Sequence, residues 1–167
     1  MPSDQFLFAK LSWPEIDAAA QAGKLILLAI ATIEDHGLHL PVDTDVAITT
    51  AICLETAKLI PDEVLLMPTV QYGYSPHHLD FPGTVTIGWS TFVEYLLDIL
   101  RSLIYHGFRK ILIVNGHGSN GPLGEMAARL GVVEHPEAQC AFVSWWELAD
   151  VRKAVAAFRE STVASHA

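Results

Sequence analysis

The stretch that decides the fold is Lys110-Ile111-Leu112-Ile113-Val114-Asn115-Gly116-His117-Gly118-Ser119-Asn120. Its aliphatic and β-branched beginning predicts a strand over 110–114. The glycines and asparagines that follow predict a tight turn, and a helix is expected from about Pro122 to Leu130. A strand that runs through a turn into a helix is the repeating unit of parallel α/β sheets.

The same alternation of strands and helices extends outward along the chain. Further strands are predicted at 24–31, 64–67 and 139–144, and further helices over 44–60, 90–105 and 145–159. A short helix is predicted to start at Ser12, where Ser12 and Glu15 form a capping box. The predicted fold class is therefore α/β, with three layers: a mostly parallel sheet, helices on both faces, and right-handed crossovers. Residues 1–167 are expected to form a single domain.

Composition and charge argue against several classes of protein. Hydrophobic residues make up 51% of the 167 residues and charged ones 17%, which is typical of a globular protein. The net charge of −9 argues against a nucleic-acid partner. The apolar run 25–32 is too short to span a bilayer, so no membrane association is expected. Met1-Pro2-Ser3-Asp4-Gln5 lacks the basic start of a signal peptide, and buried free thiols are expected at Cys53 and Cys140. A cytoplasmic location follows as an expectation.

The segment after the strand at 24–31 is rich in possible metal ligands: Ile33-Glu34-Asp35-His36-Gly37-Leu38-His39-Leu40-Pro41-Val42-Asp43-Thr44-Asp45. Glu34 and His36 lie two residues apart, so in extended chain their side chains project to the same side. Asp45 is expected at the start of the next helix, where it could bridge two cations with its two oxygens. A mixture of carboxylate and imidazole ligands without thiolate suits zinc or manganese.

The predicted sheet brings this segment and the turn at 115–120 together. Both follow a strand, and ligands of open parallel sheets bind beyond the carboxyl ends of the strands. His117 could therefore complete a site with Glu34, His36 and Asp45. Two divalent ions held this way are the usual hydrolytic arrangement. Taken singly, each residue also has a plain structural explanation, such as a helix-start carboxylate at Asp45 or a turn at 115–118.

Within the predicted helix over 44–60, an apolar face is expected from Ala47, Ile48, Ala51, Ile52, Leu54 and Leu59. The long connection over 68–88 is expected to be ordered and functional, because it is unusually long for a loop and carries aromatic and histidine residues.

Three motifs, in this order and spacing, resemble the creatininase family, also called creatinine amidohydrolase-like proteins. They are Glu34-Asp35-His36-Gly37-Leu38-His39-Leu40-Pro41 with Thr44-Asp45; Gly73-Tyr74-Ser75-Pro76-His77-His78 with Phe81-Pro82-Gly83-Thr84; and His106-Gly107-Phe108-Arg109-Lys110 with Asn115-Gly116-His117-Gly118-Ser119-Asn120. Together they cover almost the whole chain.

The resemblance implies a layered α/β fold and a metal-dependent hydrolase of amide and related carbon–nitrogen bonds in a small-molecule substrate. Glu34, His36, Asp45 and His117 match the family's metal ligands, with Asp45 bridging. It further implies one or two divalent ions per chain (zinc, manganese or iron), attack by a metal-held hydroxide, and a homo-oligomer.

The match also assigns residues around the ligands. His166 corresponds to the family's proton-shuttling histidine. Trp146 stands where creatininase has a substrate-contacting tryptophan, although packing on the core would equally explain an aromatic residue there. His78 is expected either to line the substrate pocket or to pack the loop. His39 is expected to be structural or to orient a ligand.

Two departures from the family pattern affect the predicted function. Ser119 replaces a glutamate that binds the second metal in creatininase, so Ser119 is assigned to the substrate pocket and creatinine is not the expected substrate. Relatives also continue through a His-Ala-Gly-Glu segment, whereas this chain ends at Ser165-His166-Ala167 and is expected to be short relative to the family. The alternative is therefore a catalytically incomplete metal-binding or structural remnant of the same fold.

Overall fold

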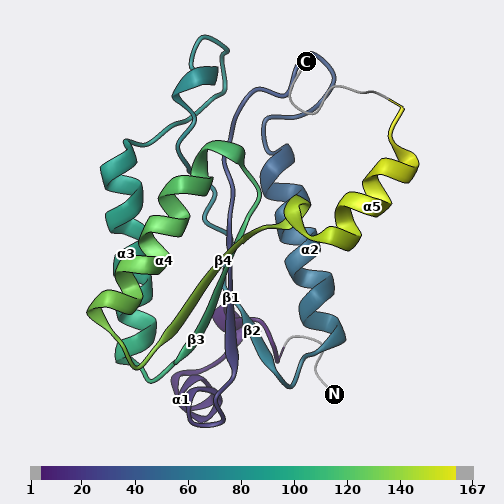
Figure 1. The fold of residues 1–167 in the computed structure, drawn as a ribbon. Helices are drawn as coiled ribbons and strands as arrows, with labels where there is room; N and C mark the ends of the chain where they lie inside the picture. Colours follow the sequence, from purple (N-terminus) through teal and green to yellow (C-terminus); the bar gives the residue numbers. More distant parts are fainter. Residues whose placement is uncertain (1–4, 161–167) are drawn as a thin grey trace.

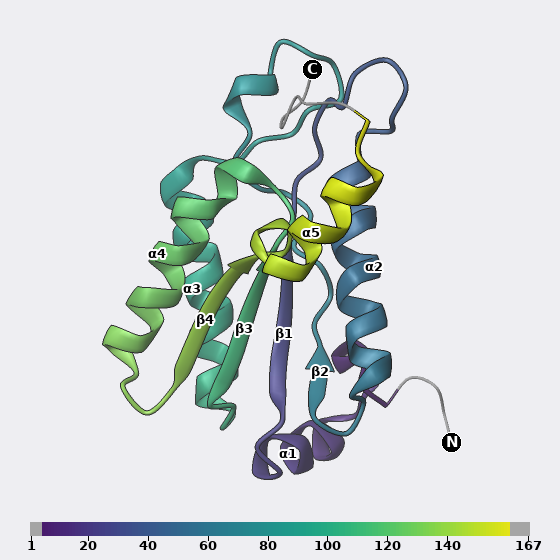
Figure 2. The ribbon, with the colours of Figure 1, turned by 45° about the vertical axis from the view of Figure 1, so that its right-hand side comes forward.

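The computed structural model describes residues 5–160, and its centre is a sheet of four parallel strands (Figures 1 and 2). The strands are β1 (Leu25–Ile30), β2 (Val64–Leu66), β3 (Lys110–Asn115) and β4 (Gln139–Ser144), in the order β2-β1-β3-β4. β1 pairs with β2 from Leu25↔Val64 and with β3 from Ile26↔Ile111. The all-parallel pairing agrees with the predicted sheet.

The strand order contains a reversal beside β1. After β1 the chain moves to β2 on one side, and it then returns past β1 to build β3 and β4 on the other side. The connections that leave β1 and β3 therefore diverge to opposite faces. Such a switch point opens a crevice at the carboxyl ends of the strands, which is where α/β sheets bind ligands.

Helices cover both faces of the sheet (Figure 1). The helices α3 (Trp89–Tyr105) and α4 (Gly121–Glu134) lie on one face, and α2 (Thr44–Leu59) lies on the other. α1 (Trp13–Gln21) lies near the amino ends of the strands, and α5 (Ala149–Phe158) lies on the α2 side (Figure 2). Single 3-10 turns are formed by η1 (Phe8–Lys10), η2 (Pro76–His78), η3 (Gly118–Asn120) and η4 (Trp145–Glu147).

The two layers of core follow the alternation of side chains along β1. Ile26, Leu28 and Ile30 pack toward α3 and α4, whereas Leu27 and Ala29 pack toward α2. All five are buried, as expected for a strand that is covered on both faces. β1 is therefore fixed from both sides, and the residues that follow it start from a rigid position.

Most predicted elements are confirmed within a few residues, but two helices differ. α4 continues to Glu134, beyond the expected end near Leu130. Gly131 lies within this extension although glycine has a low helix propensity. A Cβ there would lie 3.0 Å from Leu100 Cδ1, so α4 packs closely against α3 at this position. The single helix expected over 145–159 is divided into η4 and α5, because Leu148 has extended backbone angles.

The predicted apolar face of α2 is wrong. The buried residues of α2 are Thr49, Cys53 and Ala57, while Ile48 and Leu59 are exposed. Apolar residues occur all round this helix, so their pattern does not mark one face. The buried side chains that face the sheet are small, which allows a close approach, and of the predicted face Leu54 packs partly buried against this core.

Cys53 and Cys140 are both free thiols, as expected, but only Cys53 is buried, and Cys140 is partly exposed. Among residues 5–160, no helix has the length and apolar character needed to cross a membrane.

We expect Leu28→Ala to lower the free energy of unfolding by about 2–5 kcal/mol, because it removes a fully buried side chain from the middle of β1. The matched control is Leu59→Ala, at an 83% exposed position at the end of α2, where a change within about 0.5 kcal/mol is expected. Urea unfolding of both variants checks this. Equal losses would contradict the assignment of β1 to the centre of the core.

Candidate metal centre

Three titratable side chains meet at the switch point of the sheet. Glu34 follows the end of β1, Asp45 is the second residue of α2, and His117 follows the end of β3. Their ligand atoms lie within 4.8 Å of one another. Glu34 is fully buried and His117 is 4% exposed, so this is an interior cluster. The structure thus brings together residues that are far apart in the sequence, as predicted.

Two carboxylates converge on one ring nitrogen of His117. Nδ1 lies 3.0 Å from Glu34 Oε1 and 3.2 Å from Asp45 Oδ2. Nε2 of the same ring lies 3.1 Å from the backbone oxygen of Tyr74. Because a carbonyl oxygen only accepts, that contact places a hydrogen on Nε2. In neutral imidazole the lone pair is then on Nδ1 and faces two carboxylate oxygens. These groups repel one another unless a proton or a metal cation lies between them.

His36 makes the same two kinds of contact as His117, one with a backbone oxygen and one with the other carboxylate oxygen of Asp45. Its Nδ1 lies 3.2 Å from the backbone oxygen of Glu34, and its Nε2 lies 3.1 Å from Asp45 Oδ1. Asp45 therefore directs one oxygen toward His36 and the other toward His117. A carboxylate whose two oxygens are directed in this way could bridge two cations, and this role of Asp45 stays a prediction.

The electrostatics of the cluster favour positive charge. Burial opposes ionisation of Glu34, but contacts from His117 and Ser75 and the charges of His117 and His78 lower its pKa to about 2. Burial likewise opposes protonation of His117, yet Asp45 and Glu34 raise its pKa to about 9. A divalent ion would take the place of the proton between these carboxylates, so metal and proton compete for Nδ1.

Residues outside the predicted ligand set hold these groups in place. Ser75 is fully buried, and its hydroxyl donates a hydrogen bond to Glu34 Oε2. Asn120 Oδ1 accepts from the Tyr74 backbone N–H at 2.9 Å, and Asn120 Nδ2 donates to the Ala31 oxygen at 3.1 Å. Asn115 Oδ1 accepts from the His117 backbone N–H at 3.1 Å.

These supporting residues were not singled out from the sequence. Ser75 and Asn120 stand in the quoted motifs, but their contacts reach 41 and 89 residues along the chain, to Glu34 and to Ala31. The sequence offered only an indirect indication of their roles, which is that both are small polar residues within the quoted motifs.

Glycine permits two close approaches beside the cluster. A Cβ on Gly116 would lie 1.7 Å from Thr49 Oγ1, and one on Gly73 would lie 2.5 Å from Asn120 Oδ1. Gly116 therefore lets α2, which carries Asp45, approach the loop that carries His117. Gly73 lets the loop before η2 approach the same loop at Asn120.

The other predicted site residues, and His77 of the second motif, lie at different distances from the cluster. His77 stacks on His117 with ring centroids 5.8 Å apart, and His78 Nδ1 lies 3.8 Å from Asp35 Oδ2. Ser119 is half-buried in η3, two residues after His117. His39 is exposed on the loop after Gly37.

Two further predicted residues lie away from the cluster. Trp146 is in η4 and lines a neighbouring cavity of about 760 Å³ whose wall includes Gly118 and Glu147. His166 lies outside the described residues, so its role as proton shuttle stays a prediction.

Comparison with known proteins identifies the family. Residues 9–167 match the family model described as creatininase, creatinine amidohydrolase. The chain belongs to the creatininase family. It is 35% identical over 124 residues to the creatinine amidohydrolase of Pseudomonas putida, an alignment covering 71% of this chain and 47% of the relative. It is also 33% identical over 116 residues to the mycofactocin precursor peptide peptidase of Mycobacterium tuberculosis, covering 65% and 45%.

Solved creatininase structures share the fold. A crystal structure of creatinine amidohydrolase superposes with a TM-score of 0.85 at 27% identity, covering 96% of this chain and 66% of that chain. Similar matches include a Zn–Zn form, with a TM-score of 0.84, and a manganese form, with 0.83. The predicted three-layer α/β class is thus confirmed. The chain spans about half the length of the curated relatives that it matches.

We expect Gly116→Ala to destabilise the fold by about 1–3 kcal/mol, because its methyl group would overlap Thr49 and push α2 away from β3. Gly118→Ala is the matched control, since a Cβ there meets nothing within 4 Å. Urea unfolding of both variants measures the difference. A Gly116→Ala protein as stable as Gly118→Ala would show that α2 and the loop after β3 are not in close contact.

The raised pKa of His117 predicts how the metal-free protein responds to pH. Protonated His117 stabilises the fold below about pH 6.5, and this contribution is lost as the pH rises through about 9. The difference between these pKa values corresponds to on the order of 3 kcal/mol. In the presence of a chelator, wild-type protein should therefore lose more stability over this range than His117→Asn.

The measurement is the free energy of unfolding across that pH range for both proteins, with His135→Asn as a control. His135 lies at the end of α4. The control should follow the wild type. Parallel curves for wild type and His117→Asn would refute the coupling of His117 to the two carboxylates.

Proposed function

We propose that this chain holds a divalent metal on Glu34, Asp45 and His117, with His36 on the second oxygen of Asp45, and that it hydrolyses a carbon–nitrogen bond in a small substrate. The observation that carries the proposal is the convergence of Glu34 Oε1 and Asp45 Oδ2 on His117 Nδ1, at 3.0 and 3.2 Å. Membership of a family that includes a creatinine amidohydrolase supports the class of reaction.

The donor set fits a borderline divalent ion. Carboxylate oxygens and imidazole nitrogens without thiolate suit zinc and manganese, and iron is compatible with the same ligands. Solved creatininases are described in a Zn–Zn form and a manganese form, which supports the same metals here. When bound, such an ion polarises a carbonyl and activates water as a nucleophile.

The residues of this chain supply binding and orientation. The carbonyl oxygens of Tyr74 and Glu34 fix the rings of His117 and His36 so that one nitrogen of each faces Asp45. Ser75 holds the Glu34 carboxylate by hydrogen bonding to its other oxygen. Such supporting contacts fix both the tautomer and the direction of each ligand.

The substrate is proposed as a small amide or cyclic amide other than creatinine, because Ser119 replaces the glutamate of creatininase. Family relatives are described with different activities, among them a peptide peptidase and a pyrimidinone deformylase. Ser119, His78 and Trp146 are proposed to shape the substrate pocket. Trp146 lines a cavity bordered by Gly118, the residue after His117, which supports its part in this.

His166 is proposed as the group that moves a proton to the leaving nitrogen. A homo-oligomer and a cytoplasmic location likewise stay predictions from the sequence.

The test is zinc and manganese affinity with a matched set of variants. We expect the wild-type protein to bind zinc and to melt at a higher temperature in its presence, because a ligand that binds only the native state stabilises it. Asp45→Ala should weaken the tightest zinc affinity by at least about 10–100-fold, the loss typical even of residues that only orient ligands. His106→Ala, at an exposed histidine that caps the end of α3, should bind as the wild type does.

Hydrolysis is then assayed on creatinine, formamides and short peptides with the zinc- and manganese-loaded protein. Turnover of an amide that Asp45→Ala abolishes would support the hydrolase. Metal binding without turnover on any amide would favour the incomplete, metal-binding alternative. A wild-type protein that binds neither metal would refute the proposed centre.

A further inference from the structure

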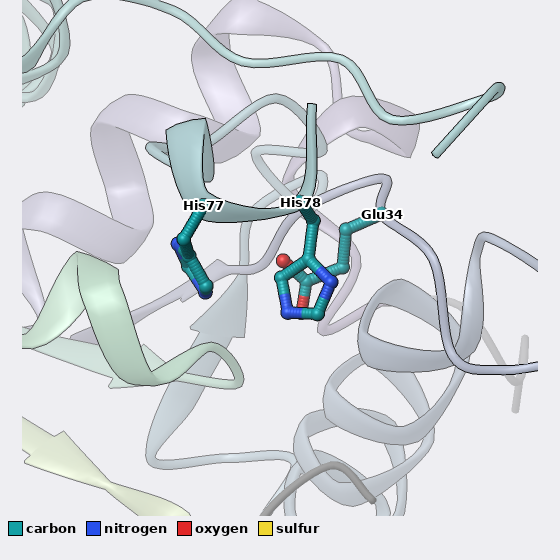
Figure 3. A group of neighbouring side chains, drawn as sticks. All are labelled: Glu34, His77 and His78. Carbon is teal, nitrogen blue, oxygen red and sulfur yellow. The ribbon is translucent and has the colours of Figure 1, made fainter. Parts of the chain in front are cut away.

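A pair of adjacent histidines in the connection between β2 and α3 lies beside Glu34. His77 and His78 belong to η2, and Figure 3 shows both rings extending from this turn on the side where Glu34 lies. The ring centroids of His77 and His78 are 4.4 Å apart. One ligand atom from each of Glu34, His77 and His78 lies within 4.8 Å of the others.

This group lies closer to solvent than the cluster on Asp45 and His117. His77 is exposed and His78 is half-buried, whereas His117 and Glu34 are buried. The two groups are in contact, because the His77 ring stacks on the His117 ring at an interplanar angle of 16°. Glu34 belongs to both groups.

The turn that carries the two histidines is anchored immediately before them. The buried Ser75 hydroxyl bonds to Glu34, and the Ser75 backbone N–H donates to Thr86 Oγ1 at 2.8 Å. Pro76 begins the turn and restricts its backbone. The histidines are thus placed by fixed neighbours, which is what a preorganised ligand pair requires.

Donor number distinguishes two possible places for a second ion. His36 Nε2 and Asp45 Oδ1 provide two donors, and Ser119 offers no carboxylate to add to them. Glu34, His77 and His78 provide three. Within the described part of the chain, the groups of three donors at this spacing include His77 and His78 but not His36.

We propose that Glu34, His77 and His78 form an outer divalent-cation site that shares the Glu34 carboxylate with the inner site on Asp45 and His117. This inference rests on the proposed function, since Glu34 serves both sites. Two imidazoles and one carboxylate suit zinc, with the remaining coordination position open to water or substrate. In this arrangement Glu34 is the carboxylate common to both ions, and His36 stays a hydrogen-bond partner of Asp45.

The test counts zinc ions per chain after equilibrium dialysis, in wild type and in His77→Phe, His78→Phe and the double variant. Phenylalanine keeps a ring against His117 but removes the nitrogens. His106→Phe is the matched control, at an exposed histidine that caps the end of α3 outside the group. Asp45→Ala removes a donor from the inner site alone. Melting temperatures measured in the presence of a chelator confirm that each variant folds. Because His77 is exposed, the His77→Phe variant is expected to fold as the wild type does.

We expect two zinc ions per wild-type and control chain, and one per chain in the double variant, with the tight inner affinity retained. Asp45→Ala should keep one ion, held on His77 and His78. If the double variant binds as many ions as the wild type while Asp45→Ala loses zinc, the outer site is refuted and the proposed centre stands. If Asp45→Ala loses both ions, Asp45 bridges them and the outer site is also refuted. A wild-type protein without bound zinc would refute both proposals.

Discussion

The arrangement around the site depends on one constraint, the complete burial of the Glu34 carboxylate at the end of the central strand. An isolated carboxylate in an interior is strongly unfavourable unless cations and hydrogen bonds compensate it. Here the compensation comes from two connections: Ser75 and His78 belong to the connection between β2 and α3, and His117 belongs to the loop after β3. Each loop is held where it is because Glu34 requires a partner from it.

That requirement explains why so long a connection between β2 and α3 is ordered. The segment reaches across the carboxyl ends of the strands, pairs as a bridge between Ile33 and Val85, and places the Tyr74 carbonyl against His117. Asn120 ties the same segment to the loop after β3 through its side-chain amide. Irregular backbone in an interior needs such partners, because its own polar groups are not paired by regular structure.

Part of this arrangement is readable from the sequence and part is not. The strand over 110–114 was predictable because its aliphatic run ends in a clear turn signal. The proximity of Glu34, Asp45 and His117 was predictable because parallel strands bring the loops that follow them to one edge of the sheet. The buried face of α2 was not, since Thr49, Cys53 and Ala57 are selected by how closely the helix approaches Gly116 and the sheet. Ser75 and Tyr74 were missed for the same reason, as their roles are set by contacts across many residues.

The position of the cluster also suggests how one fold can serve different reactions. The backbone of β1 and β3 fixes Glu34 and His117, and both strands are buried at the centre of the sheet, so these donors cannot shift without disturbing the core. Ser119, His77, His78 and Trp146 lie on loops and 3-10 turns outside that core, where substitution is tolerated more easily. A family whose relatives are described as acting on creatinine, on a precursor peptide and on a formylated pyrimidinone is consistent with this division. Under the proposed function, the residues fixed at the strand ends would hold the metal, and the surrounding loops would select the substrate.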